Sequence, residues 1–329
     1  MHRVYNSAVV AYALSAAVEL GLLDALRQGD PVDLGRFADD HSLRRGVVQA
    51  IADALAAAHI VRLEGTRAAR GHDFEAADLA RPFFQWLVAG NGRLLSNLAD
   101  FARGLDLPVL AGEDPWGRNI RAVVAASRDG ARLYFDRTFQ EALEGVDFSR
   151  VADLGCGSGG RLISLVRERP GISGIGVDIA GPAVALAEVD AEKEGVADRV
   201  SFVQDDVTRL RPRADFERVD LLTAFLMGHD FWPRDDAVRT LRMLRQAFPN
   251  ARDFILCDEC RLPDVTSLDE TIFTMGFMLV HAAMDKYIPT AEEWLDVFAE
   301  SGWRCVKVVR SGLPQSNLAF RLQPADQRF

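Results

Sequence analysis

The chain has 329 residues, of which 49% are hydrophobic and 26% are charged. This composition is that of a folded globular protein, and the length favours two domains over one. The formal net charge of −10 argues against a nucleic-acid backbone as the main partner, because phosphate binding needs a basic face.

The apolar run AVVAYALSAAV at residues 8–18 could be mistaken for the hydrophobic core of a signal peptide. It continues into Glu19 and Asp24, while the intervening leucines keep a helical period. We therefore expect a helix over residues 8–27 and a cytoplasmic protein. No other run approaches the ~20 apolar residues that a membrane span needs, so we expect no membrane partner.

The first hundred residues predict helices followed by two short strands. The expected elements are helices at 8–27, 33–41 and 42–58, a strand at 59–65 and a turn leading to a second strand. Ser42 is the expected cap of the third helix. This order is typical of a winged-helix module, and the acidic charge balance favours dimerisation over DNA binding. We expect residues 1–105 to be the dimerisation domain of a homodimer, and residues 106–147 to be a helical linker that contributes to a substrate pocket.

From residue 150 onward, apolar strands alternate with amphipathic helices. Strands are expected at 150–155, 171–179, 199–206, 219–227 and 253–259, helices at 160–169, 181–195, 233–248 and 290–302, and a terminal hairpin at 305–312 and 318–323. This alternation predicts an α/β domain over residues 148–329, with a Rossmann-like, mostly parallel sheet.

A glycine-rich turn, DLGCGSGG at 153–160, follows the first of these strands. Gly155, Gly157 and Gly160 satisfy the G-x-G-x-x-G pattern of dinucleotide sites. However, the carboxylate of Asp153 would face a pyrophosphate unfavourably. S-adenosylmethionine (SAM) has no phosphate, and its amino and sulfonium groups are cationic, so an acidic residue at this turn suits it. The glycines let the backbone approach the ligand closely.

Two further strands of this domain end in acidic residues. Asp178 is placed to accept from the two ribose hydroxyls, and Asp206 to accept from the adenine amino group. A carboxylate at one strand end is often a helix cap, but three at successive strand ends are better explained as an adenosyl pocket. The predicted cofactor contacts are Asp153, Gly155, Gly157, Asp178, Ile179, Asp205, Asp206 and Val207.

The segments DLGCGSG, GVD and QDDV resemble those of class I SAM-dependent methyltransferases. The segment HDFWPRDDAVRTLRMLRQAFPN and the winged-helix front half resemble small-molecule O-methyltransferases, in which an HDW-type histidine is the general base. LLTAFLMGHDFWP, FTMGF, YIPT and ESGWRCVK are most similar to the 2-oxo acid C-methyltransferases of the phenylpyruvate type. That resemblance implies a seven-stranded sheet, SAM as cofactor, and one iron or zinc ion held by His229, Asp230 and His281.

The residue types suit that chemistry. Two imidazoles and a carboxylate form a facial triad that leaves metal positions open for the keto and carboxylate oxygens of a 2-oxo acid. A Lewis acid there would acidify the β-carbon, which then attacks the methyl of SAM. Arg118 or Arg128 could bind the substrate carboxylate, and the resemblance favours Arg118. The expected activity is β-methylation of a 2-oxo acid in natural-product biosynthesis.

Other interpretations of the same residues remain open. His281 could be an ordinary core histidine, and Asp230 could cap the following helix or orient His229. A metal-free O-methyltransferase of a phenolic small molecule needs only His229 as its base. A third alternative is a DNA-bound regulator that binds an adenosyl ligand, which the charge balance disfavours.

The acceptor's side chain is not decided by the sequence. Asp285 lies one helical turn beyond His281, where a carboxylate could pair with the cationic tail of a guanidino 2-oxo acid. Asp285 could equally pair with an arginine or face solvent. Phe273, Phe277 and Met278 on the same segment would suit an aromatic or a branched-chain acid.

Overall fold

A computed structural model describes residues 1–29, 31–262, 272–312 and 316–325. The chain forms two compact units, Met1–Leu133 and Tyr134–Phe329. The division after Leu133 falls inside the segment 106–147 that the sequence predicts as a linker.

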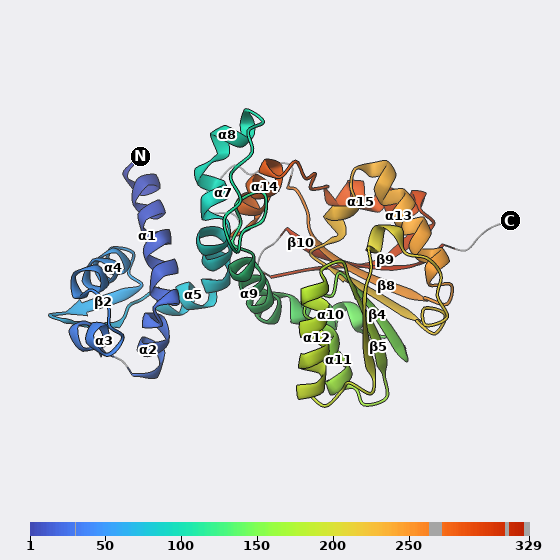
Figure 1. The fold of residues 1–329 in the computed structure, drawn as a ribbon, viewed down its shortest axis with the longest axis horizontal. Helices are drawn as coiled ribbons and strands as arrows, with labels where there is room; N and C mark the ends of the chain where they lie inside the picture. Colours follow the sequence, from blue (N-terminus) through green and yellow to red (C-terminus); the bar gives the residue numbers. More distant parts are fainter. Residues whose placement is uncertain (30, 263–271, 313–315, 326–329) are drawn as a thin grey trace. The chain divides into compact units, whose positions relative to one another are not determined.

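The first unit begins with helices and a small antiparallel sheet (Figure 1). The predicted helix over 8–27 is in fact two helices, α1 (His2–Glu19) and α2 (Leu22–Gln28), because Gly21 takes a left-handed φ of 77° between them. Asp33 caps α3 (Leu34–Asp40) by accepting from the Arg36 N–H at 2.8 Å. The predicted cap at Ser42 is wrong, since α4 (Arg45–Ala57) starts after Arg44 without a side-chain cap.

Three short strands complete the winged-helix arrangement of this unit. They are β1 (Val32–Asp33), β2 (Val61–Glu64) and β3 (Arg67–Arg70), in the order β1-β3-β2. The helices of the rest of the unit are α5 (Phe74–Leu79), α6 (Arg81–Phe84), η1 (Gln85–Gly90), α7 (Gly92–Ser96), α8 (Leu98–Ala102) and α9 (Ile120–Gly130). Residues 103–119 contain no helix, so the expected helical linker over 106–147 is helical only from Ile120 onward. Among the described residues, no single helix is long and apolar enough to cross a membrane. The helices α1 and α2, which meet at 67°, would together be long and apolar enough, judged by length and composition alone.

The second unit is built on the predicted seven-stranded sheet, in the order β6-β5-β4-β7-β8-β10-β9. The strands are β4 (Arg150–Leu154), β5 (Ser173–Asp178), β6 (Val200–Gln204), β7 (Leu221–Phe225), β8 (Asp253–Glu259), β9 (Trp303–Arg310) and β10 (Asn317–Pro324). The first five are parallel, while β10 runs antiparallel to both β8 and β9. The terminal hairpin is therefore confirmed, and its second strand is the one that joins the sheet.

Helices cover both faces of this sheet (Figure 1). One face packs against α10 (Asp136–Leu143), α11 (Gly160–Glu168) and α12 (Gly181–Lys193), and the other against α13 (Arg234–Ala247) and α15 (Ala291–Glu300). Successive strand residues enter opposite cores, as Val151 and Ala152 do, because side chains alternate along a strand. The predicted capping box of α15, between Thr290 and Glu293, is confirmed.

The parallel strands place five chain segments at one edge of the sheet, because their carboxyl ends all lie there. These segments follow β4, β5, β6, β7 and β8, and they include the short helices η3 (Val207–Arg209) and η4 (Gly228–Phe231). Ligands of open α/β sheets bind at such an edge. We call it the carboxyl edge below.

Candidate active site

The loop after β4 is tightly constrained at three glycines. Gly155, Gly157 and Gly159 have positive φ values of 68°, 53° and 73°. A Cβ on Gly155 would lie 2.8 Å from Met227 Cγ, and one on Gly159 would lie 2.6 Å from a Phe202 ring carbon. Gly160, by contrast, has open space around its Cβ position. The pattern that the backbone requires is therefore G-x-G-x-G, and Gly160 is not part of it.

Asp178 fixes this loop from the end of β5. Its two carboxylate oxygens accept hydrogen bonds from the N–H groups of Gly157 at 2.7 Å and Ala180 at 2.9 Å. Each oxygen retains a second lone pair. The predicted ribose contact is thus compatible with the role of Asp178 in shaping the loop.

The acidic pair after β6 is also engaged by its own backbone. Asp206 accepts from the N–H and hydroxyl of Thr208 at 2.9 and 2.7 Å, which caps η3, and Asp205 accepts from the Asp206 N–H at 2.8 Å. The helix-cap interpretation therefore holds for Asp206. Ile179 is 67% exposed at this edge, whereas Val207 is buried in the core.

Asp153 lies buried near the end of β4. Its carboxylate accepts from the Thr223 hydroxyl at 2.6 Å, and burial raises its pKa above the ordinary aspartate value. Acidic side chains therefore lie at the ends of three adjacent strands, β6, β5 and β4, as the sequence predicts.

On the other side of β4, the loop after β7 holds a buried histidine–aspartate pair. His229 Nδ1 donates to Asp258 Oδ1 at 2.9 Å, and the His229 backbone N–H donates to Asp258 Oδ2 at 2.6 Å. The Glu259 N–H adds a third hydrogen bond to Asp258 at 2.8 Å. Burial alone would lower the pKa of His229, but the attraction of Asp258 outweighs it and the pKa is raised. Because Nδ1 donates to Asp258, Nε2 is the ring nitrogen of His229 that could accept a proton from a substrate.

Asp258 is a functional candidate that the sequence reasoning missed. It is fully buried at the end of β8, the strand that pairs with β7. The sequence did contain a signal for it. Asp258 and Glu259 are acidic residues at the end of a predicted strand, which is the pattern that identified the predicted adenosyl-binding carboxylates.

The second predicted histidine is brought against the first. His281, on α14 (Thr274–Ala283), has its ring centre 4.8 Å from that of His229, nearly perpendicular to it. Its Nδ1 donates to the Phe277 carbonyl oxygen at 2.7 Å. The Phe277 ring stacks on His281 at 3.8 Å and meets His229 edge-on at 5.4 Å.

The predicted metal triad, however, is not assembled. Among the residues that the structure describes, no three His, Cys, Asp or Glu side chains are grouped so that they could hold a metal ion. Asp230 instead pairs with Lys286 at 2.8 Å. Burial would raise the pKa of Asp230, but His229 and Lys286 together lower it. Two imidazole nitrogens suit iron or zinc, yet the third ligand is committed elsewhere, so this arrangement does not fit a metal ion held by all three residues.

Two other residues considered in the sequence analysis, Arg118 and Asp285, have surroundings that differ from those expected. Arg118, in the first unit, donates from Nε to Asp114 at 2.6 Å and lies over the Trp116 ring. Asp285 is exposed with a φ of 55°, beyond the end of α14 at Ala283. The expectation that Asp285 shares a helical face with His281 is therefore wrong, which removes the structural reason for a cationic substrate tail.

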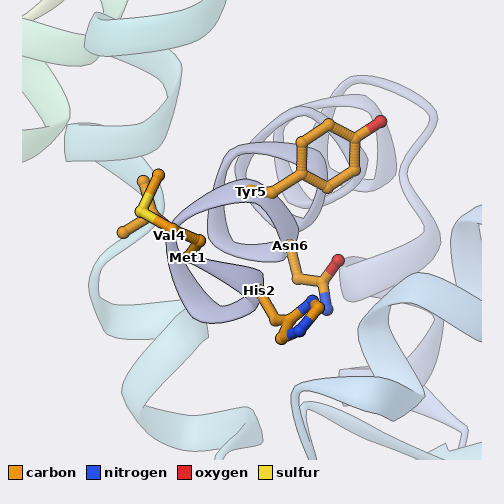
Figure 2. A pocket seen from close by; sticks show the side chains of 5 residues that line it. All are labelled: Met1, His2, Val4, Tyr5 and Asn6. Carbon is orange, nitrogen blue, oxygen red and sulfur yellow. The ribbon is translucent and has the colours of Figure 1, made fainter.

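A shallow hollow also lies at the first turn of α1, in the first unit (Figure 2). It is lined by Met1, His2, Val4, Tyr5 and Asn6, all of which are exposed. None of these is a predicted site residue, and the hollow carries no buried polar side chain that would recognise a ligand.

The glycine loop, the acidic strand ends and the seven-stranded sheet define a class I SAM-dependent methyltransferase. Residues 151–249 match the family described as Methyltransferase domain. The chain is 42% identical to the methyltransferase ungE' of Aspergillus campestris (strain IBT 28561), over 93% of this chain and 92% of that protein. It is 28% identical to the indolepyruvate C-methyltransferase of Streptomyces griseus, over 95% of this chain and 92% of that protein.

The fold has close counterparts among solved structures. The mitomycin 7-O-methyltransferase MmcR superposes with a TM-score of 0.73 at 18% identity, covering 98% of this chain and 96% of that one. The chain belongs to the SAM-dependent class I methyltransferases, and it shares the fold of that O-methyltransferase.

Proposed function

We propose that this enzyme transfers the methyl group of SAM to the β-carbon of a 2-oxo acid, with an aromatic or branched side chain. The observation that carries the proposal is the second imidazole, His281, held against His229 by Phe277. Methylation of a phenol needs one base, whereas a 2-oxo acid must first lose a β-proton and then be stabilised as an enolate. The similarity to the indolepyruvate C-methyltransferase supports the same acceptor class.

In the proposed mechanism, His229 Nε2 removes the β-proton while Asp258 holds the Nδ1–H and stabilises the imidazolium that forms. His281, when protonated at Nε2, donates to the keto oxygen on which the enolate charge gathers. The β-carbon then attacks the methyl carbon, the bond between that carbon and sulfur breaks, and S-adenosylhomocysteine leaves. The β-proton remains on His229 until it passes to solvent.

The phenyl ring of Phe277 and its neighbour Phe273, whose ring centres lie 5.3 Å apart, give this site an aromatic wall. An aromatic acceptor such as phenylpyruvate or indolepyruvate would bury its ring against such a wall, because offset and edge-to-face ring contacts are favourable. We therefore rank aromatic 2-oxo acids first among the acceptors.

No step of this proposal passes through a metal ion, because Asp230 pairs with Lys286. The predicted iron or zinc is tested separately, by measuring the metal content of protein purified without chelator. About one ion per chain, lost in His281→Ala, would mean that Asp230 leaves Lys286 to complete the triad. Metal-free protein with full activity would establish the His229–Asp258 pair as the sole base.

O-Methylation of a phenol remains the second candidate, because one observation favours it. The His229–Asp258 pair is a complete general base by itself, with three hydrogen bonds holding the carboxylate. Under this alternative, His281→Ala would leave turnover within a few-fold of wild type.

We also propose that the enzyme is a homodimer that uses its first unit. Helix α1 exposes Val4, Tyr5, Val9 and Tyr12, which are between 47% and 74% accessible. A clustered apolar surface of this kind is typical of an interface. Light scattering after gel filtration tests this, and a monomer would contradict it.

The acceptor class is tested by incubating the enzyme with SAM and each of phenylpyruvate, indolepyruvate, a branched-chain 2-oxo acid and a set of phenols. The proposal predicts methylated product from one or more 2-oxo acids, lost in both His229→Asn and His281→Ala. Turnover of phenols alone would contradict it.

A further inference from the structure

Arg161 is a buried cation that the proposed mechanism does not use. It is the second residue of α11 and directly follows the glycine loop. Its side chain is only 14% exposed, and its Nη1 is fully buried without a hydrogen-bond partner among the residues that the structure describes. Burying a guanidinium N–H without a hydrogen-bond partner costs free energy, so we looked for a function of this group.

The surroundings hold the guanidinium in place without satisfying it. Its central carbon lies 3.4 Å from the ring centre of Phe225, at the end of β7, and 5.6 Å from that of Phe139 on α10. The nearest carboxylate oxygen of Asp136 is 3.9 Å from Nη1, which is too far for a hydrogen bond. The aromatic faces thus fix the position of the cation and leave its Nη1 donor unused.

A buried carboxylate lies on the same pair of strands, since Asp153 on β4 accepts from Thr223, two residues before Phe225 on β7. Burial lowers the pKa of Arg161, and the charge of Asp153 opposes that shift. Asp153 is hydrogen-bonded to Thr223, and no hydrogen bond joins it to Arg161 in the described part of the chain. Two opposite charges that are near each other but not bonded match a zwitterion, whose ammonium would bind the carboxylate and whose carboxylate would bind the guanidinium.

We propose that Arg161 is a carboxylate-binding residue of this active site. Two ligands could supply that carboxylate: the methionine end of SAM or the 2-oxo acid acceptor. The position beside Asp153 and the glycine loop favours SAM, whose amino-acid end is a zwitterion. The acceptor alternative rests on the function proposed above, whereas the SAM alternative does not.

The test compares pairs of ligands that differ in the carboxylate. S-adenosylhomocysteine carries the amino-acid end, and 5′-methylthioadenosine lacks it. By calorimetry, Arg161→Gln is expected to weaken S-adenosylhomocysteine binding by about 10- to 100-fold, the usual range for a charge-assisted hydrogen bond, and to leave methylthioadenosine binding unchanged. Arg161→Lys keeps the charge and should recover part of the loss.

The second arm uses the acceptor. If its carboxylate is the ligand, Arg161→Gln raises the KM for phenylpyruvate and leaves S-adenosylhomocysteine binding at the wild-type value. Turnover of phenylacetone, which has no carboxylate, would then be unaffected. The cofactor arm needs no acceptor, so a wrong acceptor class would not be mistaken for failure of the Arg161 proposal.

Arg167→Gln is the matched control, since Arg167 lies on the same helix, is 53% exposed and pairs with Glu194. Arg167→Gln should change neither the affinities for S-adenosylhomocysteine and methylthioadenosine nor the KM for phenylpyruvate. The proposal is overturned if folded Arg161→Gln binds every ligand normally, or if it loses S-adenosylhomocysteine and methylthioadenosine equally, which would indicate a structural role. If Arg161→Gln does not fold, the same comparisons are made with Arg161→Lys, and equal effects on both members of each pair overturn it.

Discussion

The two halves of the carboxyl edge acquire their polar side chains in different ways. In the half formed by β4, β5 and β6, the acidic residues mainly hold strand-end loops: Asp206 binds Thr208 two residues on, and Asp178 binds Gly157 of the neighbouring loop. Asp153 is the exception, since it binds Thr223 on β7. In the half formed by β7 and β8, His229 depends on Asp258, 29 residues away, and meets His281 from a third element. The first half therefore consists mainly of loops that follow its own strands, whereas the second brings together side chains from three separate elements.

This difference predicts that substitutions in the second half affect chemistry more than stability. His229→Asn should reduce kcat by about 10²- to 10⁴-fold, the usual contribution of a general base, with the affinity for S-adenosylhomocysteine unchanged. Steady-state kinetics and calorimetry measure the two quantities. An unchanged kcat would remove His229 from the mechanism.

Behind the His229–Asp258 pair, Glu259 makes the stability depend on pH. Burial raises the pKa of Glu259 to about 7, although the hydroxyls of Ser316 and Thr274 donate to it. Its folded-state pKa is above the unfolded value, so its contribution is full below about pH 4.5 and is lost as pH rises to about 7. That loss amounts to about 3 kcal/mol. Denaturant titrations should show this slope in wild type but not in Glu259→Gln; equal slopes would contradict the assignment.

In the cofactor half, the largest stability effect is expected at Gly159. An alanine there combines a left-handed φ of 73° with a Cβ 2.6 Å from Phe202, so Gly159→Ala should cost about 1–3 kcal/mol. Gly160→Ala has open space and should be neutral or slightly stabilising. Thermal unfolding of the ligand-free proteins compares them, and equal melting temperatures would refute the G-x-G-x-G assignment.

The smallest effect is expected at the ion pair of Asp230 and Lys286. Both side chains are more than a third exposed, so Lys286→Met should change the free energy of unfolding by no more than about 1 kcal/mol. A loss of several kcal/mol would show instead that the pair anchors the loop after β7.

The sequence predicted the sheet and the acidic residues at the ends of β4, β5 and β6, because both depend on local patterns, while the contacts of these residues with SAM stay a prediction. Alternating apolar strands and helices identify the sheet, and Asp178 follows directly from its strand. Two local errors had local causes: Gly21 interrupts the first helix, and Gly159 replaces Gly160 in the loop. Both corrections come from backbone angles that the spacing of residue types does not reveal.

The acceptor half was predicted only in part. The motif around His229 identified one histidine, and resemblance pointed to His281, which the structure does place beside it. Asp258 was missed because its role requires the register between β7 and β8. The choice of Lys286 as the partner of Asp230 also depends on tertiary placement, and no spacing rule connects the two.

The most direct test of the account is the proton NMR spectrum of the product made from phenylpyruvate and SAM. We expect a methyl doublet coupled to a single β-proton, which shows that the methyl group is bound to carbon, and no such product from His229→Asn. A methyl singlet from a methoxy group, or turnover confined to phenols, would contradict C-methylation and make His229 the base of an O-methyltransferase.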